Sequence, residues 1–188
     1  MWFFSSPHIV FGEGALGNLE TLKGRCACIV TDTILVNLGF VERVREALAS
    51  TGIEIAVIDN VEPDPSLETV KAGAERMLEI KPDWIIALGG GSVIDAAKGM
   101  WILYEHPDYD PESINPIDSI KLRVKARFIA IPTTAGTGAE TTWAIVLTNR
   151  AEQRKLGLGN REAIPDIAIL DPEIIRDLPA RITADTGL

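Results

Sequence analysis

The chain is poor in the residues that most often hold metal ions or form cross-links. Its 188 residues include two cysteines and two histidines. Cys26 and Cys28 share one face of a predicted strand, where a disulfide would be strained and two thiols alone make no tetrahedral zinc site. His8 and His106 have no partner at ligand spacing, which argues against a histidine metal site or a His-based catalytic triad. We therefore expect reduced thiols in a cytoplasmic protein.

Excess positive charge, membrane-spanning runs and a secretion signal are also missing. The formal net charge of −9 at pH 7 disfavours a nucleic-acid-binding surface, because no basic stripe can replace the phosphate counterions. No apolar run reaches the length of a membrane span. The apolar residues 1–7 are too few, and lack the basic start, for a signal peptide. A small basic cluster is expected on a solvated edge strand and consists of Lys121, Arg123, Lys125 and Arg127.

What the chain does contain is a repeated succession of strand, turn and helix. Apolar runs between glycines or polar residues predict strands over 25–31, 53–58, 84–88, 128–131 and 166–170. Helical spacing predicts helices over 41–50, from 66 onward, over 92–104, over 172–177 and from 183 onward. Residues 143–148 and 155–158 are predicted to form a hairpin around 149–153. The alternation predicts an α/β fold over residues 1–188, a Rossmann-like, doubly wound, mostly parallel sheet with helices on both faces.

The most informative segment is an apolar strand that runs directly into three glycines. They are Gly89, Gly90 and Gly91. Consecutive glycines let a backbone approach a ligand closely. Ser92 is predicted to cap the next helix, with Asp95 in the second position of a capping box. Because the free N–H groups and the dipole of a helix start favour phosphate, this segment predicts a nucleotide.

Other polar residues follow the carboxyl ends of predicted strands, where ligands bind in open parallel sheets. They are Asp32, Asp64, Thr133, Thr134 and Thr137. Asp32 is either a turn or helix cap, or an acceptor for ribose hydroxyls that would repel a 2′-phosphate; the residues alone leave both open. Asp32 precedes the glycines, whereas the acidic residue of the common dinucleotide motif follows them, and no G-x-G-x-x-G fingerprint is present. The common dinucleotide motif is therefore not used. Lys98 is expected on the solvated side of its helix rather than along the phosphates.

Two long motifs resemble those of the iron-containing (group III) alcohol dehydrogenases. They are Gly89-Gly90-Gly91-Ser92-Val93-Ile94-Asp95-Ala96-Ala97-Lys98 and Ile131-Pro132-Thr133-Thr134-Ala135-Gly136-Thr137-Gly138-Ala139-Glu140. Shorter matches follow the same order at Phe11–Ala15, Val30–Asp32 and Asp171–Glu173, so the resemblance covers nearly the whole chain. It implies a dehydroquinate-synthase-like N-terminal domain that binds NAD(P). It also implies the interconversion of a small alcohol with its aldehyde or ketone.

The same resemblance implies roles for individual residues. The glycine loop and Ser92 would hold the pyrophosphate, and Asp32 would favour NAD over NADP. Asp64 stands where the family often has asparagine. The remaining residues expected around the cofactor are Asp95, Thr133, Thr134, Thr137, Thr142 and Lys155.

Finally, the resemblance implies Fe²⁺ or another divalent metal, which polarises the substrate oxygen. Its ligands are expected after Leu188, in a helical domain expected to be absent from this chain. The chain would then supply the cofactor-binding half of a homodimeric enzyme and would turn over little substrate by itself. The alternative is a stand-alone nucleotide-binding module without catalytic activity, and a weaker one is a lyase of the dehydroquinate-synthase type.

Overall fold

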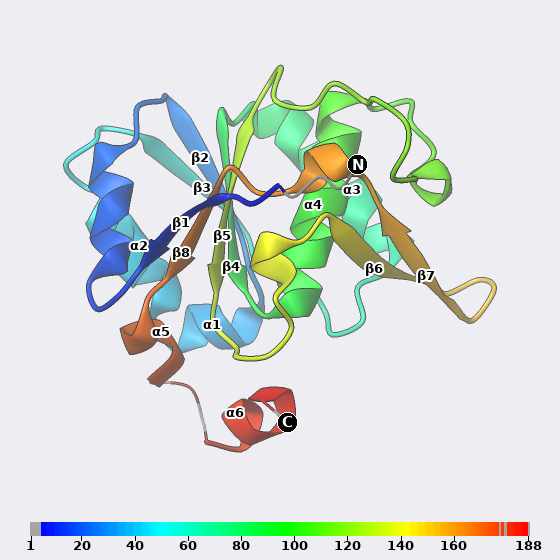
Figure 1. Cartoon of the computed structure of the whole chain (residues 1–188). Coiled ribbons are helices and arrows are strands. Elements are labelled where there is room, and N and C mark those ends of the chain that lie inside the picture. The colour runs from blue at the N-terminus through cyan, green and yellow to red at the C-terminus, as the bar shows by residue number, and fades with distance from the viewer. Residues whose placement is uncertain (1–4, 177, 179, 188) are drawn as a thin grey trace.

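A six-stranded sheet runs through the middle of the molecule, in the order β1-β8-β5-β4-β2-β3 (Figure 1). The computed structural model describes residues 5–176, 178 and 180–187, so predictions that touch residues 1–4, Asp177 and Leu188 lie outside it. The strands are β1 (His8–Phe11), β2 (Cys26–Val30), β3 (Glu54–Ile58), β4 (Trp84–Gly89), β5 (Arg127–Pro132) and β8 (Ile167–Leu170). Their neighbouring pairs are all parallel, which confirms the predicted α/β class.

Helices cover both faces of this sheet (Figure 1). One face carries α3 (Leu67–Ile80) and α4 (Gly91–Glu105), and the other carries the 3₁₀ helix η1 (Ala15–Thr21), α1 (Thr33–Asn37), α2 (Phe40–Leu48) and α5 (Pro172–Arg176). The last helix, α6 (Ala180–Gly187), contains the predicted helix start at 183. Short 3₁₀ turns are η2 (Pro111–Ser113), η3 (Ala139–Thr141) and η4 (Arg161–Ala163).

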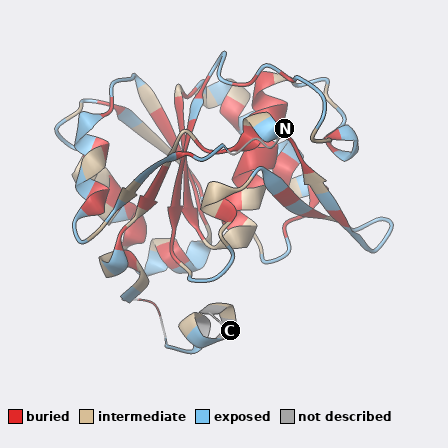
Figure 2. Cartoon of the chain, viewed as in Figure 1, coloured by how far each residue is buried: buried red, intermediate tan, exposed pale blue. Residues whose placement is uncertain are grey.

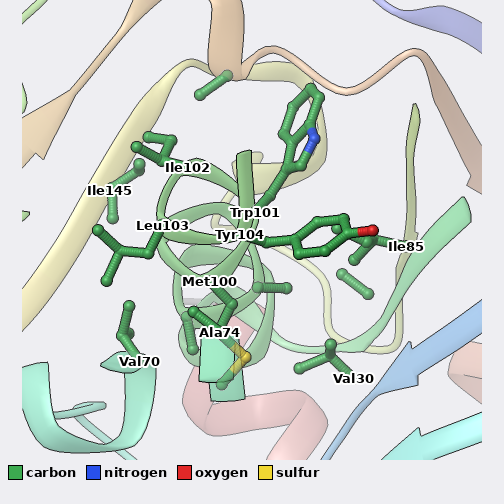
Figure 3. Close-up of a cluster of buried hydrophobic side chains, with 14 of the residues drawn as sticks. Val30, Val70, Ala74, Ile85, Met100, Trp101, Ile102, Leu103, Tyr104 and Ile145 are labelled. Atoms are coloured by element: carbon green, nitrogen blue, oxygen red, sulfur yellow. The ribbon is translucent and has the colours of Figure 1, made fainter. Parts of the chain in front are cut away.

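The central strands bury both of their faces, which is why they read as continuous apolar runs. Along β4, Ile85 and Ala87 join the core under α3 and α4, while Ile86 and Leu88 join the core on the opposite face. Figure 2 shows the middle of the sheet mostly buried, and every residue of β4 is buried. Figure 3 shows α4 packed between helix α3, the sheet and the hairpin, with Met100 near Ala74.

The predicted hairpin is confirmed as β6 (Ala144–Asn149) and β7 (Arg154–Gly159), which pair antiparallel. Ile145 and Leu147 of β6 are buried against the core that surrounds α4. The N–H of Thr148 donates to the carbonyl of Pro65 at 2.8 Å, which ties the hairpin to the loop before α3.

Two predictions about charged and sulfur-containing residues have opposite outcomes. The predicted solvated edge strand at the basic cluster is wrong, because Arg127 begins β5 in the interior of the sheet. Arg123 donates to the Asp166 carboxylate at 2.8 Å and lies over the Trp101 ring, 5.0 Å from its centroid. The two cysteines are free thiols, as predicted, and burial raises the pKa of Cys28 to about 12.

None of the helices in the described residues is both long and apolar enough to cross a bilayer.

Candidate nucleotide-binding site

A cleft of about 590 Å³ opens where β2, β3, β4 and β5 end. Because these strands are parallel, their carboxyl ends meet at one edge of the sheet, which is where α/β folds bind ligands. Four segments that follow the strands line the cleft. They are Asp32–Leu35, Asp59–Pro63, Gly90–Val93, and Thr133 and Thr134 with Thr137. The structure thus brings together Asp32, Ser92, two of the three glycines and three of the four threonines predicted from the sequence.

The helix that follows the glycines begins one residue earlier than predicted. Gly90 is the N-cap of α4, with an extended backbone (φ −76°, ψ −172°), and no side chain caps this helix start. The predicted Ser92 cap and its capping box are therefore wrong. Asp95 instead accepts a hydrogen bond from the backbone N–H of Val146 at 3.0 Å. An uncapped helix start at the floor of a cleft presents backbone N–H groups and the positive end of the helix dipole to a ligand.

Glycines are required here because a second loop lies directly against them. A Cβ on Gly90 would lie 3.1 Å from Oγ1 of Thr134, and a Cβ on Gly91 would lie 3.1 Å from Cγ2 of Thr137. Any larger residue at either position would push the threonines out of place. We call residues 133–138 the threonine turn; its first N–H, on Thr133, donates to the carbonyl of Gly89 at 3.1 Å.

One hydroxyl in this turn has no hydrogen-bond partner among the described residues. Oγ1 of Thr134 is buried, yet nothing donates to it or accepts from it. Buried polar groups are nearly always satisfied, and leaving one unpaired costs about 1–3 kcal/mol. A polar ligand in the cleft would provide the missing partner, so the residues present fit a nucleotide.

Asp32 is held in a defined position beside the cleft. It is the N-cap of α1, and its Oδ1 accepts the backbone N–H of Leu35 at 2.9 Å. The residue is partly exposed and lines the cleft. The structure thus shows the capping role that the sequence left open, and it leaves the carboxylate at a cleft wall.

The other predicted site residues do not line the cleft. Asp64 has a left-handed backbone (φ 54°) and pairs with Lys155 at 2.7 Å, and both side chains are mostly exposed. Gly89 ends β4 beneath the cleft floor. Thr142 follows η3 and lies near the buried amine of Lys98, so the prediction of a solvated Lys98 is wrong.

Several residues of the cleft wall were missed from the sequence. Asp59, Asn60 and Glu62, which follow β3, line the cleft. Leu178 and Thr186, near the end of the chain, line it as well. The position of Asp59 directly after a predicted strand is the signal that could have found it. Burial alone would raise the pKa of the Glu62 carboxyl, but hydrogen bonds from Thr69 and Ser66 hold this pKa below its ordinary value.

The described residues contain no group of three or more His, Cys, Asp or Glu side chains that could hold a metal ion. The metal implied by the resemblance therefore has no ligand set among the described residues.

Comparison with known proteins identifies the family. The model of the iron-containing alcohol dehydrogenases matches residues 6–172. The chain belongs to this family. An NADPH-dependent butanol dehydrogenase of Clostridium saccharobutylicum is 45% identical over the whole chain, which covers 49% of that relative. The bifunctional aldehyde-alcohol dehydrogenase AdhE of Escherichia coli K12 is 39% identical, with 100% of this chain and 23% of the relative covered.

Solved structures of the family share the fold. Alcohol dehydrogenase from Oenococcus oeni superposes with a TM-score of 0.89 at 31% identity, covering 100% of this chain and 50% of that one. Sulfoacetaldehyde reductase from Bifidobacterium kashiwanohense, solved with NAD⁺, gives a TM-score of 0.86 at 30% identity, again covering 100% and 50%. The chain thus spans about half the length of these structures and at most about half of the curated relatives described above.

Proposed function

We propose that this chain binds NAD and acts in the NAD-dependent interconversion of a small alcohol with its aldehyde or ketone. The observation that carries the proposal is the unpartnered Thr134 hydroxyl, which lies against Gly90 at the uncapped start of α4. A phosphate there would be bound by backbone N–H groups and the helix dipole. Membership in the alcohol dehydrogenase family supports the reaction class.

Each wall of the cleft has a task in this proposal. The first turn of α4 holds the pyrophosphate, and the threonine turn fixes its orientation from the opposite side. Asp32 accepts hydrogen bonds from the adenosine ribose, which favours NAD over NADP. A bound nicotinamide would supply the hydride-transfer chemistry that links an alcohol to its carbonyl compound.

The relatives do not indicate a single cofactor, because their names state different ones. One relative is named as NADPH-dependent, and one solved structure contains NAD⁺. The preference for NAD therefore rests on the carboxylate of Asp32 alone. A 2′-phosphate near this carboxylate would be repelled.

Calorimetric titration of NAD⁺ into the chain tests the proposal, with two alanine variants in parallel. Gly91→Ala adds a methyl group 3.1 Å from Thr137, at the phosphate position, whereas a Cβ on Gly157 meets nothing within 4 Å. We expect Gly91→Ala to weaken NAD⁺ binding about tenfold or more, equivalent to roughly 1.4 kcal/mol. Gly157→Ala should bind like the unchanged chain. Absence of NAD⁺ binding at millimolar concentration, or equal binding by both variants, would refute the proposed site.

An alcohol-oxidation assay with added Fe²⁺ or Zn²⁺ separates the proposed enzyme from a nucleotide-binding module. Metal-dependent formation of NADH from a primary alcohol supports the enzyme. NAD⁺ binding without NADH formation is expected of the module and also of a cofactor-binding half by itself, so only NADH formation decides between them.

A further inference from the structure

Lys98 is fully buried on α4, although its sequence pattern places it among ordinary helix lysines. Lysine is almost never fully buried unless its charge is compensated. Here its amine donates to three backbone carbonyls, at 2.8 Å to Ala139, 2.7 Å to Thr142 and 3.1 Å to Ala144. These three acceptors match the three N–H donors of an ammonium group.

The three carbonyls all belong to one segment, which runs from η3 into β6. That segment directly follows the threonine turn, whose other end is fixed by β5. Without Lys98, residues 139–144 would lose the hydrogen bonds that hold them against the middle of α4. The amine thus anchors the free end of the turn that lines the cleft.

Lys98 also has a defined relation to the glycine loop. Lys98 lies seven positions after Gly91, close to two helical turns, so both lie on the same side of α4. Gly91 lies against Thr137 of the threonine turn. Two helical turns further along α4, Lys98 contacts Ala139, which follows the threonine turn in the sequence. One helix therefore presents the proposed phosphate site and holds the opposite wall of the cleft.

The charge on Lys98 is balanced by its surroundings. Burial lowers the pKa of the Lys98 amine to about 8, while the nearby carboxylates of Asp95, on α4, and Glu140, in η3, oppose this shift. The amine therefore remains mostly protonated at neutral pH and keeps its three donors.

We propose that Lys98 is a positioning residue for the cofactor cleft. It fastens residues 139–144 to α4 and thereby keeps Thr134 and Thr137 against Gly90 and Gly91. This inference rests on the proposed function, because its consequence is measured as affinity for NAD⁺. It assigns the affinity to a residue that does not line the cleft.

Two variants of Lys98 and one matched control test the inference. Lys98→Met and Lys98→Gln both shorten the side chain by one atom, but Met removes all N–H donors whereas Gln keeps two. Lys71→Met, at an exposed position of α3, makes the same chemical change away from the cleft. Urea unfolding first establishes conditions in which each variant is folded.

We expect NAD⁺ affinity to fall in the order unchanged chain, Lys98→Gln, Lys98→Met, with a loss of about tenfold or more for Met, as for removal of hydrogen bonds to a charged group. Amide exchange of residues 134–142, measured without NAD⁺, should accelerate in the same order while β4 and β5 stay protected. Lys71→Met should change neither quantity.

A merely structural lysine would lower the urea midpoint and leave both quantities unchanged in the folded variants, and that result would overturn the inference. If Lys98→Met does not fold, the same two measurements on Lys98→Gln decide the question. If the unchanged chain binds no NAD⁺, the proposed function fails, whereas the exchange rates of residues 134–142 still show whether Lys98 holds the turn.

Discussion

Replacing Asp32 by asparagine should change the choice between NAD and NADP without changing the stability of the fold. Asp32 caps α1 through one carboxylate oxygen, 2.9 Å from the N–H of Leu35. Asparagine provides an equivalent oxygen and ranks with aspartate as an N-cap, so the cap, worth about 1 kcal/mol, is retained. The substitution therefore removes the negative charge and little else.

The expected magnitude follows from the two interactions that the charge affects. Hydrogen bonds to a charged acceptor contribute about 1.5–3 kcal/mol and neutral ones about 0.5–1.5 kcal/mol, so NAD⁺ should bind about tenfold more weakly. A 2′-phosphate about 4 Å from the carboxylate is repelled by roughly 1–4 kcal/mol per unit charge between the water and protein-surface limits. With repulsion near the lower limit, NADP⁺ should bind about tenfold more tightly, and the ratio of affinities should shift by about 100-fold.

Calorimetric titration of both cofactors against the unchanged chain, Asp32→Asn and Asp32→Ala measures this ratio. Asp32→Ala loses the cap as well as the charge, so it should unfold at lower urea concentration and yet show a similar change in the ratio. A ratio that stays within about threefold in a folded Asp32→Asn chain would refute the ribose-binding role, since about 0.7 kcal/mol is then the largest effect left for the charge.

Three further outcomes are expected. Trp101→Ala should lower the free energy of unfolding in urea by about 3–5 kcal/mol, because the ring stacks on Phe128 at 5.2 Å and its N–H donates to Ala126; a loss below about 1 kcal/mol contradicts that packing. Burial raises the pKa of Asp95 from 3.8 to about 6, so the folded chain binds this proton more tightly than the unfolded chain does. As pH falls from about 6 toward 4, the unchanged chain should therefore gain stability relative to Asp95→Asn. If the free energies of urea unfolding of the two chains differ by the same amount at both pH values, the shift is contradicted. The edge strand β1 exposes 77% of Phe11, and light scattering should detect a dimer rather than a monomer.

The central sheet could be predicted from the sequence because its strands are buried on both faces. β4 and β5 appear as apolar runs between turn residues, and the hairpin is recognisable from the polar residues between its strands. The edge strand β1 was missed, since its four residues carry no apolar alternation. Three of them are exposed and one is partly buried.

The errors in the site arose from contacts between residues far apart in the chain. The motif from Gly89 to Asp95 predicts a helix start, but Ser92 could cap only a helix that begins after it, whereas α4 begins at Gly91. Val146, whose N–H donates to Asp95, lies 51 residues away in the sequence. Lys98 likewise finds its acceptors 41 to 46 residues later. No local pattern signals a lysine whose charge is compensated by carbonyls from another element.

Amide hydrogen exchange with and without saturating NAD⁺ tests the central claim most directly, because it locates the cofactor on the chain. We predict new protection in Asp32–Leu35, Gly90–Val93 and the threonine turn, three of the segments that line the cleft. Protection confined to other segments, such as residues 121–127 at the opposite edge of the sheet, or no change in these three, would contradict it.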